Sequence, residues 1–294
     1  MSQDELAVVR GAIAPATTAS SDGVASRASL EALRDELRGW GRVVVAFSGG
    51  ADSAFLAWVA HDTLGFDHAL AVTAVSPSLP DAERSECAAL AAEWGLRWRE
   101  VETDELAHDA YARNDGDRCY WCKDALLRAT APLAAAEDAT VALGVNLDDL
   151  GDHRPGQRAA AERGARFPLV DAGFTKADVR GWSRRLGLRT WDKPAAACLA
   201  SRLPYGTPVT LQRLAAVERA EAGLRALGFR DLRVRHYGDL ARLEVPVDRL
   251  GDVVALRADV VAAVQEAGYR YVTVDLEGLR SGNLNAALGS EDTP

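Results

Sequence analysis

Six consecutive residues, Ser48-Gly49-Gly50-Ala51-Asp52-Ser53, have the types and order of an anion-binding turn. The apolar run 43–47 before them predicts a buried parallel strand, and the glycine pair lets the backbone turn into a helix over 54–64. At such a junction, backbone N–H groups and the helix dipole can hold a phosphate or pyrophosphate. Ser48 and Ser53 can add hydroxyl donors, while Asp52 can hold Mg²⁺ or simply cap the helix. The lysine of a GxxxxGK[ST] loop is missing, which excludes that class of phosphate loop.

Three of the four cysteines lie in segments that could carry sulfur or metal chemistry. Cys119 and Cys122 form a CxxC at the start of an expected helix, and Cys198 lies in the segment Ala-Ala-Cys-Leu-Ala-Ser-Arg that ends at Arg202. A CxxC can be a redox disulfide, half of a zinc site or part of an iron–sulfur site. It can also be two small residues packed at a helix start. Cys87, inside an expected helix, is interpreted as a small buried apolar side chain.

The elements that must position these residues follow a strand–helix alternation. Strands are expected at 43–47, 69–76, 98–101 and 141–145. Helices are expected at 29–40, 54–64, 81–94, 105–113 and 176–186. This alternation predicts an α/β fold with a parallel sheet. Ligands bind beyond the carboxyl ends of such strands. We therefore expect Ala74 and Ser76 to contact adenine or ribose. We assign Gly144, Asn146 and Lys176, which begins a helix, to the same nucleotide site.

After residue 206 the pattern becomes a helix at 210–227, strands at 232–237 and 240–245, a helix at 248–266 and a strand at 271–276, which predicts a smaller α+β domain. Its arginines are either solvated or arranged to clamp a phosphate or carboxylate. Arg202, Arg233 and Arg235 are the candidate substrate-binding residues. The expected division is a disordered extension at 1–26, an α/β domain at 27–206, a substrate-binding and oligomerisation domain at 207–285, and a tail at 286–294.

The composition of the chain narrows the classes of function. The 294 residues are 48% hydrophobic, enough for a substantial core, and the net charge of −9 argues against a general nucleic-acid partner. There is neither an apolar stretch of 18 residues nor a signal-peptide pattern, which predicts a cytoplasmic protein without membrane contact. Four cysteines are too few for a disulfide scaffold.

Four motifs together resemble the LarE family of the ATP pyrophosphatase superfamily, whose loop reads SGGxDS. They are the loop at 48–53, Arg-Cys-Tyr-Trp-Cys-Lys at 118–123, Ala-Ala-Cys-Leu-Ala-Ser-Arg at 196–202, and the stretch 275–285. The resemblance runs from about Leu30 to Asn285 and implies a PP-loop (adenine nucleotide alpha hydrolase-like) domain, ATP, Mg²⁺ and self-association. Members of the family adenylate a pyridinium biscarboxylic acid mononucleotide and make a thiocarboxylate for the nickel-pincer nucleotide of lactate racemase.

For the site residues, the resemblance implies that Gly49, Gly50 and Ser53 hold the leaving pyrophosphate with Mg²⁺. It also implies that sulfur reaches the acyl-adenylate, either from the thiol of Cys198, which would become dehydroalanine, or from sulfide on a [4Fe-4S] cluster. Relatives with a cluster have a three-cysteine set like Cys119, Cys122 and Cys198. Our first hypothesis is the cluster, the second is sacrifice of Cys198, and the third is that the cysteines are inert. Near Cys198 in sequence, Lys193 and Arg202 could lower its pKa.

Other functions share part of these features. An ammonia-using NAD or GMP synthetase has the same loop but does not need the segment around Cys198. A tRNA thiolase has the loop and a cluster, but its polyanionic partner fits poorly with an acidic chain. A nucleotide-sensing module would bind ATP without releasing pyrophosphate.

Overall fold

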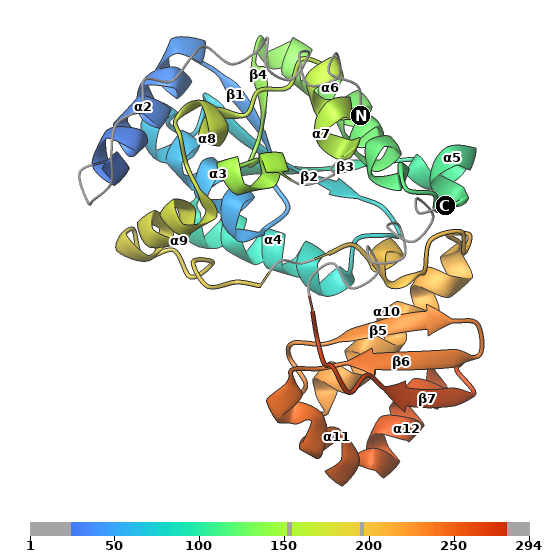
Figure 1. Cartoon of the computed structure of the whole chain (residues 1–294). Coiled ribbons are helices and arrows are strands. Elements are labelled where there is room, and N and C mark those ends of the chain that lie inside the picture. The colour runs from blue at the N-terminus through green and yellow to red at the C-terminus, as the bar shows by residue number, and fades with distance from the viewer. Residues whose placement is uncertain (1–24, 152–154, 195–196, 281–294) are drawn as a thin grey trace, which may run out of the picture. The chain divides into compact units, whose positions relative to one another are not determined.

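The computed structural model describes residues 25–151, 155–194 and 197–280, which form two compact units (Figure 1). Within these ranges the first helix, α2 (Ala25–Trp40), begins four residues before the predicted start at Ser29. Residues 1–24 of the predicted extension, the polar stretch 152–154, Ala196 of the cysteine segment and everything beyond 280 lie outside the described residues.

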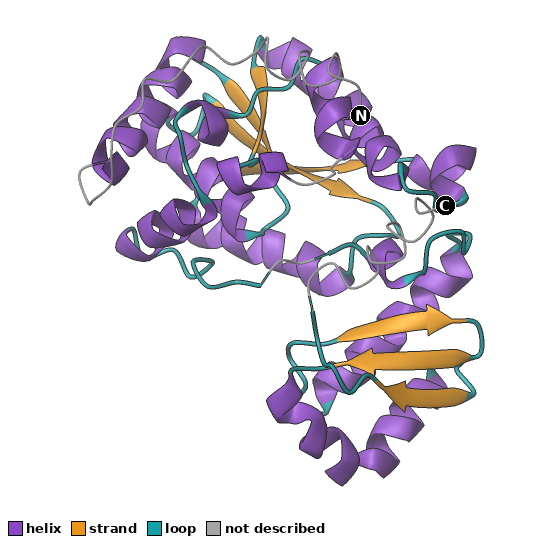
Figure 2. Cartoon of the chain, in the orientation of Figure 1, coloured by secondary structure: helices purple, strands orange, loops and turns teal. Residues whose placement is uncertain are grey.

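The first unit contains a four-stranded, all-parallel sheet in the order β3-β2-β1-β4 (Figure 2). Its strands are β1 (Val43–Ala46), β2 (Ala69–Val75), β3 (Arg97–Glu102) and β4 (Thr140–Leu143). β1 pairs with β2 on one side and with β4 on the other, so Val43 faces both Ala69 and Thr140. The central strand is therefore the apolar β-branched run that leads into the glycine turn, as the sequence predicts.

Helices cover both faces of this sheet. Successive side chains of a strand point to opposite faces, and Val43 and Val45 join the core made with α2, α3 and α4, whereas Val44 packs with Ala134 of α6 on the other face. The remaining helices of this part of the chain are α3 (Ala51–Leu64), α4 (Asp81–Trp94), α6 (Arg118–Glu137), η2 (Leu147–Gly151), α7 (Pro155–Glu162), α8 (Pro168–Asp171) and α9 (Lys176–Arg185).

The second unit has its own core and a three-stranded sheet in the order β5-β6-β7. β5 and β6 are antiparallel and β6 and β7 parallel, and α10 and α12 pack their apolar sides against them. Its elements are η1 (Glu105–Ala107), α5 (Asp109–Ala112), η3 (Leu199–Arg202), α10 (Leu211–Ala226), β5 (Arg233–Tyr237), β6 (Leu240–Glu244), η4 (Val247–Arg249), α11 (Leu250–Ala255), α12 (Arg257–Glu266) and β7 (Tyr271–Val274). This is the predicted α+β order.

Two predicted helices are broken. The helix expected from Glu105 to Arg113 is interrupted at His108, whose backbone is extended and whose ring nitrogen accepts a hydrogen bond from the N–H of Ala110. The helix expected from Asp248 to Glu266 becomes η4, α11 and α12, with Leu256 as the N-cap of α12 at φ −95° and ψ 18°. Neither break has a glycine or proline at its centre, so the sequence gives no signal for it.

The two compact units divide the chain differently from the predicted boundary at residue 206. Segments 76–80, 104–118 and 197–206 group with the second unit, whereas the sequence division keeps them with the first. The functional division of the chain stays a prediction. Within the described ranges no helix is both long and apolar enough to cross a membrane.

Candidate functional site

The loop between β1 and α3 closes on itself through its two serines. Ser53 Oγ accepts from the backbone N–H of Ser48 at 3.2 Å, lies 3.0 Å from Ser48 Oγ, and donates to the carbonyl of Gly50 at 3.2 Å. Gly49 has φ +68°, in the left-handed region that favours glycine. Gly50 caps α3 without a side-chain hydrogen bond. The first-turn N–H groups of α3 thus lack helical acceptors and form the anion-binding geometry that the sequence predicts.

The start of the loop is fixed by the neighbouring strand. Thr73 Oγ1, buried in β2, donates to the carbonyl of Phe47 at 2.7 Å and accepts from Trp98 Nε1 at 2.9 Å. A threonine in an apolar run carries no motif signal, so the sequence does not predict this role of Thr73. Its hydroxyl orients the Phe47–Ser48 peptide, which follows β1 and leads into the turn.

Residues that follow β4 lie against the N-terminus of α3. A Cβ on Gly144 would lie only 2.8 Å from the backbone nitrogen of Ser53, so this position requires the close approach that glycine alone permits. The buried side chain of Asn146 donates to Asp52 Oδ1 at 3.1 Å, and Lys176 Nζ lies 3.6 Å from Asp52 Oδ2. The structure therefore brings together the predicted residues of the loop with Gly144, Asn146 and Lys176.

Two aspartates hold Asn146 and Lys176 in place. Asp148 Oδ2 accepts from the backbone N–H of Lys176 at 2.7 Å, and its own N–H donates to Asn146 Oδ1 at 3.0 Å. Asp149 Oδ2 accepts from the N–H of Asn146 at 3.2 Å. Both aspartates follow Asn146 closely in the sequence, but their spacing alone does not predict that they accept these hydrogen bonds.

Lys193 reaches the loop from a distant part of the chain. Its Nζ donates to the carbonyl of Gly49 at 3.1 Å and to Glu83 Oε2, on α4, at 2.7 Å. On the same side of the loop lies Cys87, fully buried as predicted, whose Sγ would be 3.0 Å from a Cβ on Gly49. Burial raises the pKa of the Cys87 thiol to about 11, so it is protonated at neutral pH.

The residues predicted to contact adenine or ribose fall in different units. Ala74 is half-buried in β2 of the first unit. Ser76 belongs to the segment 76–80 that groups with the second unit, where its Oγ accepts from the N–H of Ser78 at 3.2 Å. A contact of either residue with the nucleotide stays a prediction.

The cysteines of the predicted cluster also fall in different units. Cys119, exposed, and Cys122, half-buried, lie in the first turns of α6, where α7 packs so closely that a Cβ on Gly156 would be 3.0 Å from the carbonyl of Cys119. Cys198 is half-buried and is the N-cap of η3 in the second unit. Within the described ranges, no group of three His, Cys, Asp or Glu side chains is placed to hold a metal ion. Because Cys198 belongs to a different unit from Cys119 and Cys122, a cluster bound by all three stays a prediction.

Two of the three predicted substrate-binding arginines make buried ion pairs. Arg202 donates from Nε to Glu221 at 2.8 Å, and Arg235 donates to Glu244 at 2.8 Å, with both carboxylates fully buried. Arg233, in contrast, donates to the backbone carbonyl of Arg280 at 3.0 Å. Burial lowers the pKa of Arg233, and the nearby charges of Arg235 and Arg202 lower it further. An anion beside Arg233 would relieve this repulsion.

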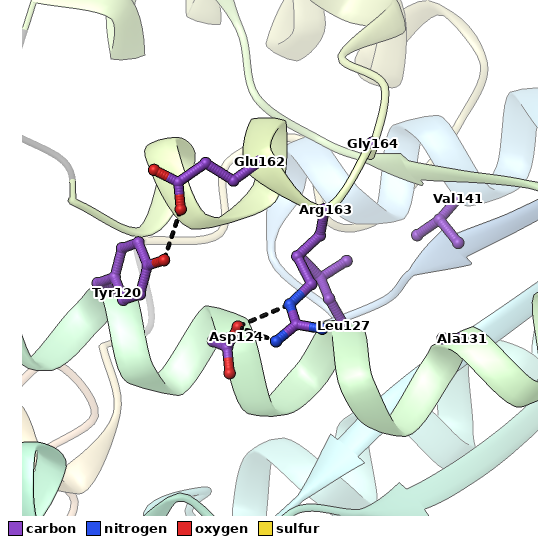
Figure 3. A pocket seen from close by; sticks show the side chains of 8 residues that line it. All are labelled: Tyr120, Asp124, Leu127, Ala131, Val141, Glu162, Arg163 and Gly164. Carbon is purple, nitrogen blue, oxygen red and sulfur yellow. Dashed lines mark hydrogen bonds and ion pairs between the residues drawn. The ribbon is translucent and has the colours of Figure 1, made fainter. Parts of the chain in front are cut away.

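A cavity of about 570 Å³ lies elsewhere in the first unit, beside α6 and β4 (Figure 3). Asp124 pairs there with Arg163, and the hydroxyl of Tyr120 donates to Glu162, so these contacts join α6 to the end of α7. No residue predicted to bind nucleotide lines this cavity. The lining consists of Tyr120, Asp124, Leu127, Ala131, Val141, Glu162, Arg163 and Gly164.

The residues around the loop fit ATP with Mg²⁺. Free N–H groups at the start of α3 suit phosphate oxygens, and the Asp52 carboxylate, which here faces an amide and an ammonium group, is the oxygen ligand that Mg²⁺ prefers.

Comparisons with known proteins show which proteins the chain is similar to. The NAD synthase family profile matches residues 27–118, which include the loop. An uncharacterized protein of Synechocystis sp. is 45% identical over 262 residues, covering 88% of this chain and 97% of that protein. Pyridinium-3,5-bisthiocarboxylic acid mononucleotide synthase of Lactiplantibacillus plantarum is 40% identical over 263 residues, covering 89% and 94%. An uncharacterized protein of Methanocaldococcus jannaschii is 24% identical over 241 residues, covering 82% and 91%.

Identity at this level over nearly the whole length of both chains shows a common family, and the loop geometry accords with it. The chain belongs to the LarE family of ATP-dependent sulfur transferases, enzymes of the PP-loop ATP pyrophosphatase superfamily, as its motifs predict.

Proposed function

We propose that this enzyme uses ATP to adenylate a carboxylate of a pyridinium biscarboxylic acid mononucleotide and converts it to a thiocarboxylate, a step towards the nickel-pincer nucleotide. The observation that carries the proposal is the convergence of Asp52, Asn146 and Lys176 on the free N-terminus of α3. The 40% identity to the Lactiplantibacillus plantarum synthase supports the choice of substrate.

The first step follows from the arrangement around the loop. A substrate carboxylate oxygen attacks the α-phosphorus of ATP, and pyrophosphate leaves. The first-turn N–H groups of α3, with the hydroxyls of Ser48 and Ser53, hold the leaving group. Asp52 would hold Mg²⁺, which neutralises phosphate charge. Lys176, at the start of α9, adds a positive charge beside Asp52.

We assign the phosphate of the mononucleotide to the second unit, at Arg233. No carboxylate within the described residues forms an ion pair with it, and burial first, then the positive charges of Arg235 and Arg202, lower its pKa. Arg202 and Arg235 contribute to this positive potential while staying paired with Glu221 and Glu244. Self-association through the second unit is part of the same proposal.

The three cysteines leave two candidate sources of sulfur. In the sacrificial route, the thiolate of Cys198 displaces AMP from the acyl-adenylate. The Cα proton of Cys198 then leaves and its Cβ–S bond breaks, which gives the thiocarboxylate and dehydroalanine. In the cluster route, an iron site bound by Cys119, Cys122 and Cys198 would supply sulfide, and the three side chains would stay unchanged.

Pyrophosphate release with the mononucleotide present tests the proposed function. We expect release that depends on both ATP and the mononucleotide, together with a thiocarboxylate product. Release driven by ammonia or by tRNA instead would favour a synthetase or a tRNA thiolase, and ATP binding without any release would favour a sensing module.

Intact mass after reaction of anaerobically prepared protein separates the sulfur sources. Loss of the mass of H₂S at Cys198 in a single turnover identifies the sacrificial route. Repeated turnover on added sulfide with all cysteines unchanged, together with equal loss of activity in Cys119→Ala, Cys122→Ala and Cys198→Ala, identifies the cluster. An inert Cys198→Ala substitution would contradict both routes.

A further inference from the structure

We infer that Lys193 is a positioning residue for the phosphate-binding loop and that Glu83 holds its ammonium group in place. Lys193 Nζ donates to the carbonyl of Gly49 at 3.1 Å and to Glu83 Oε2 at 2.7 Å. The side chains of Lys193 and Glu83 are 17% and 24% exposed, so both ends of this bridge are largely shielded from water. The inference rests on the proposed binding of ATP at this loop.

The stereochemistry of the peptide bond gives this contact its effect. In a trans peptide, the carbonyl oxygen of one residue and the N–H of the next point in opposite directions. The chain has no cis peptide bonds in its described part, so fixing the Gly49 carbonyl on Lys193 turns the N–H of Gly50 away from Lys193. Gly50 is the N-cap of α3, where N–H groups are available for a phosphate.

Gly49 makes this restraint necessary. With φ +68° and no side chain, its two flanking peptides can rotate more freely than those of any other residue. A Cβ at position 49 would lie 3.0 Å from Cys87 Sγ, so a residue with a side chain, whose backbone is less free to rotate, is disfavoured there. A hydrogen bond from a charged donor stabilises one orientation of the peptide before ATP arrives.

The backbone that carries Lys193 is itself held. The N–H of Lys193 donates to the carbonyl of Thr190 at 3.2 Å, and Arg180 on α9 donates to the carbonyl of Lys193 at 3.3 Å. Lys193 thus reaches the loop from a fixed segment. In a second role, the ammonium group would contact the β- or γ-phosphate directly, and Glu83 would then compete with that phosphate for it.

Removal of Glu83 separates these two roles. If Lys193 acts through the Gly49 carbonyl, Glu83→Ala loosens the ammonium group and weakens binding of the pyrophosphate part of ATP. If Lys193 contacts phosphate directly, Glu83→Ala frees the lysine and tightens binding. Because Glu83 and Lys193 form one unit, the double variant should bind no more weakly than Lys193→Met.

The experiment measures binding of α,β-methylene-ATP with Mg²⁺, and of AMP, to the full-length chain. For Lys193→Met and Glu83→Ala we expect roughly ten- to hundredfold weaker binding of α,β-methylene-ATP, with AMP binding changed less than twofold and partial recovery in Lys193→Arg. The matched control is Arg84→Ala. Arg84 lies on α4 next to Glu83 and forms an exposed ion pair with Glu100 of β3, so this variant should bind both ligands normally.

Three results would overturn the inference: unchanged α,β-methylene-ATP binding in Lys193→Met, tighter binding in Glu83→Ala, or equal losses for AMP and α,β-methylene-ATP. If the wild-type chain itself does not bind α,β-methylene-ATP, the proposed function fails instead. The two failures are therefore distinguishable.

Discussion

Replacing Gly144 by alanine should disable the site without a change in any polar group. A Cβ at this position would lie 2.8 Å from Ser53 N and 2.9 Å from both Ser53 Cα and the carbonyl carbon of Asp52. All three atoms are backbone at the start of α3 and cannot rotate away. Ordinary contacts are about 3.5–4.0 Å, so the end of β4 and the helix must separate by roughly 0.5–1 Å.

The expected cost has two parts. Overpacking of this kind destabilises the fold by about 1–3 kcal/mol, which lowers Tm by roughly 2–10 °C for a chain of this size. A displacement of about 1 Å at a reacting centre costs on the order of a hundredfold in rate. We therefore expect pyrophosphate release in Gly144→Ala to fall about ten- to hundredfold at a temperature where the variant is fully folded.

Gly181→Ala is the matched control for this experiment. Gly181 lies within α9, and a Cβ there meets nothing within 4 Å. Alanine at that position should leave pyrophosphate release unchanged and stabilise the fold by about 0.5–1 kcal/mol. A Gly144→Ala enzyme with normal Tm and normal pyrophosphate release would refute the close-packing argument.

Asp52→Ala should abolish pyrophosphate release with a circular dichroism spectrum like that of the wild type, and normal release would remove Asp52 from the site. Arg202→Ala should lower the free energy of unfolding by about 3 kcal/mol because it leaves the buried Glu221 with a partial partner. Arg233→Ala should instead raise KM for the mononucleotide far more than KM for ATP, and the opposite pattern would contradict its assignment. Burial, and then the adjacent carboxylate of Asp171, raise the pKa of Glu36 to about 7. Because the folded state binds the proton of Glu36 more tightly than the unfolded state, the free energy of unfolding should fall by about 1–3 kcal/mol as pH rises from 4.5 to 7. Urea titrations at several pH values should find a smaller pH dependence in Glu36→Gln.

The parts of this molecule that were predictable are those encoded over short stretches of sequence. The β1 run, the glycine turn and the start of α3 are contiguous, so strand, turn and dipole could be inferred together. Asn146 and Gly144 were assigned to the site because strand ends converge in a parallel sheet. That rule identifies the edge of the sheet but not which atoms meet there.

The contacts that the sequence does not predict join residues that are far apart along the chain or lack a motif. Lys193 and Gly49 are separated by 144 positions, and nothing in either segment indicates the other. The buried pair of Arg202 and Glu221 is another example, because Glu221 lies on α10, a helix whose composition resembles that of a solvated surface. Burial of charge depends on packing, which periodicity does not report.

The central position of β1 has a consequence for synthesis on the ribosome. Its loop leaves the ribosome about 100 residues before Gly144 and Asn146, and at about 5–20 residues per second this interval lasts roughly 5–20 s. During this time the edge of β1 that pairs with β4 has no partner, and the loop lacks its contacts with the residues that follow β4. Nucleotide capture therefore has to wait for β4. Until then β2 covers only the opposite edge of β1, so the edge that awaits β4 is open to pairing with another molecule.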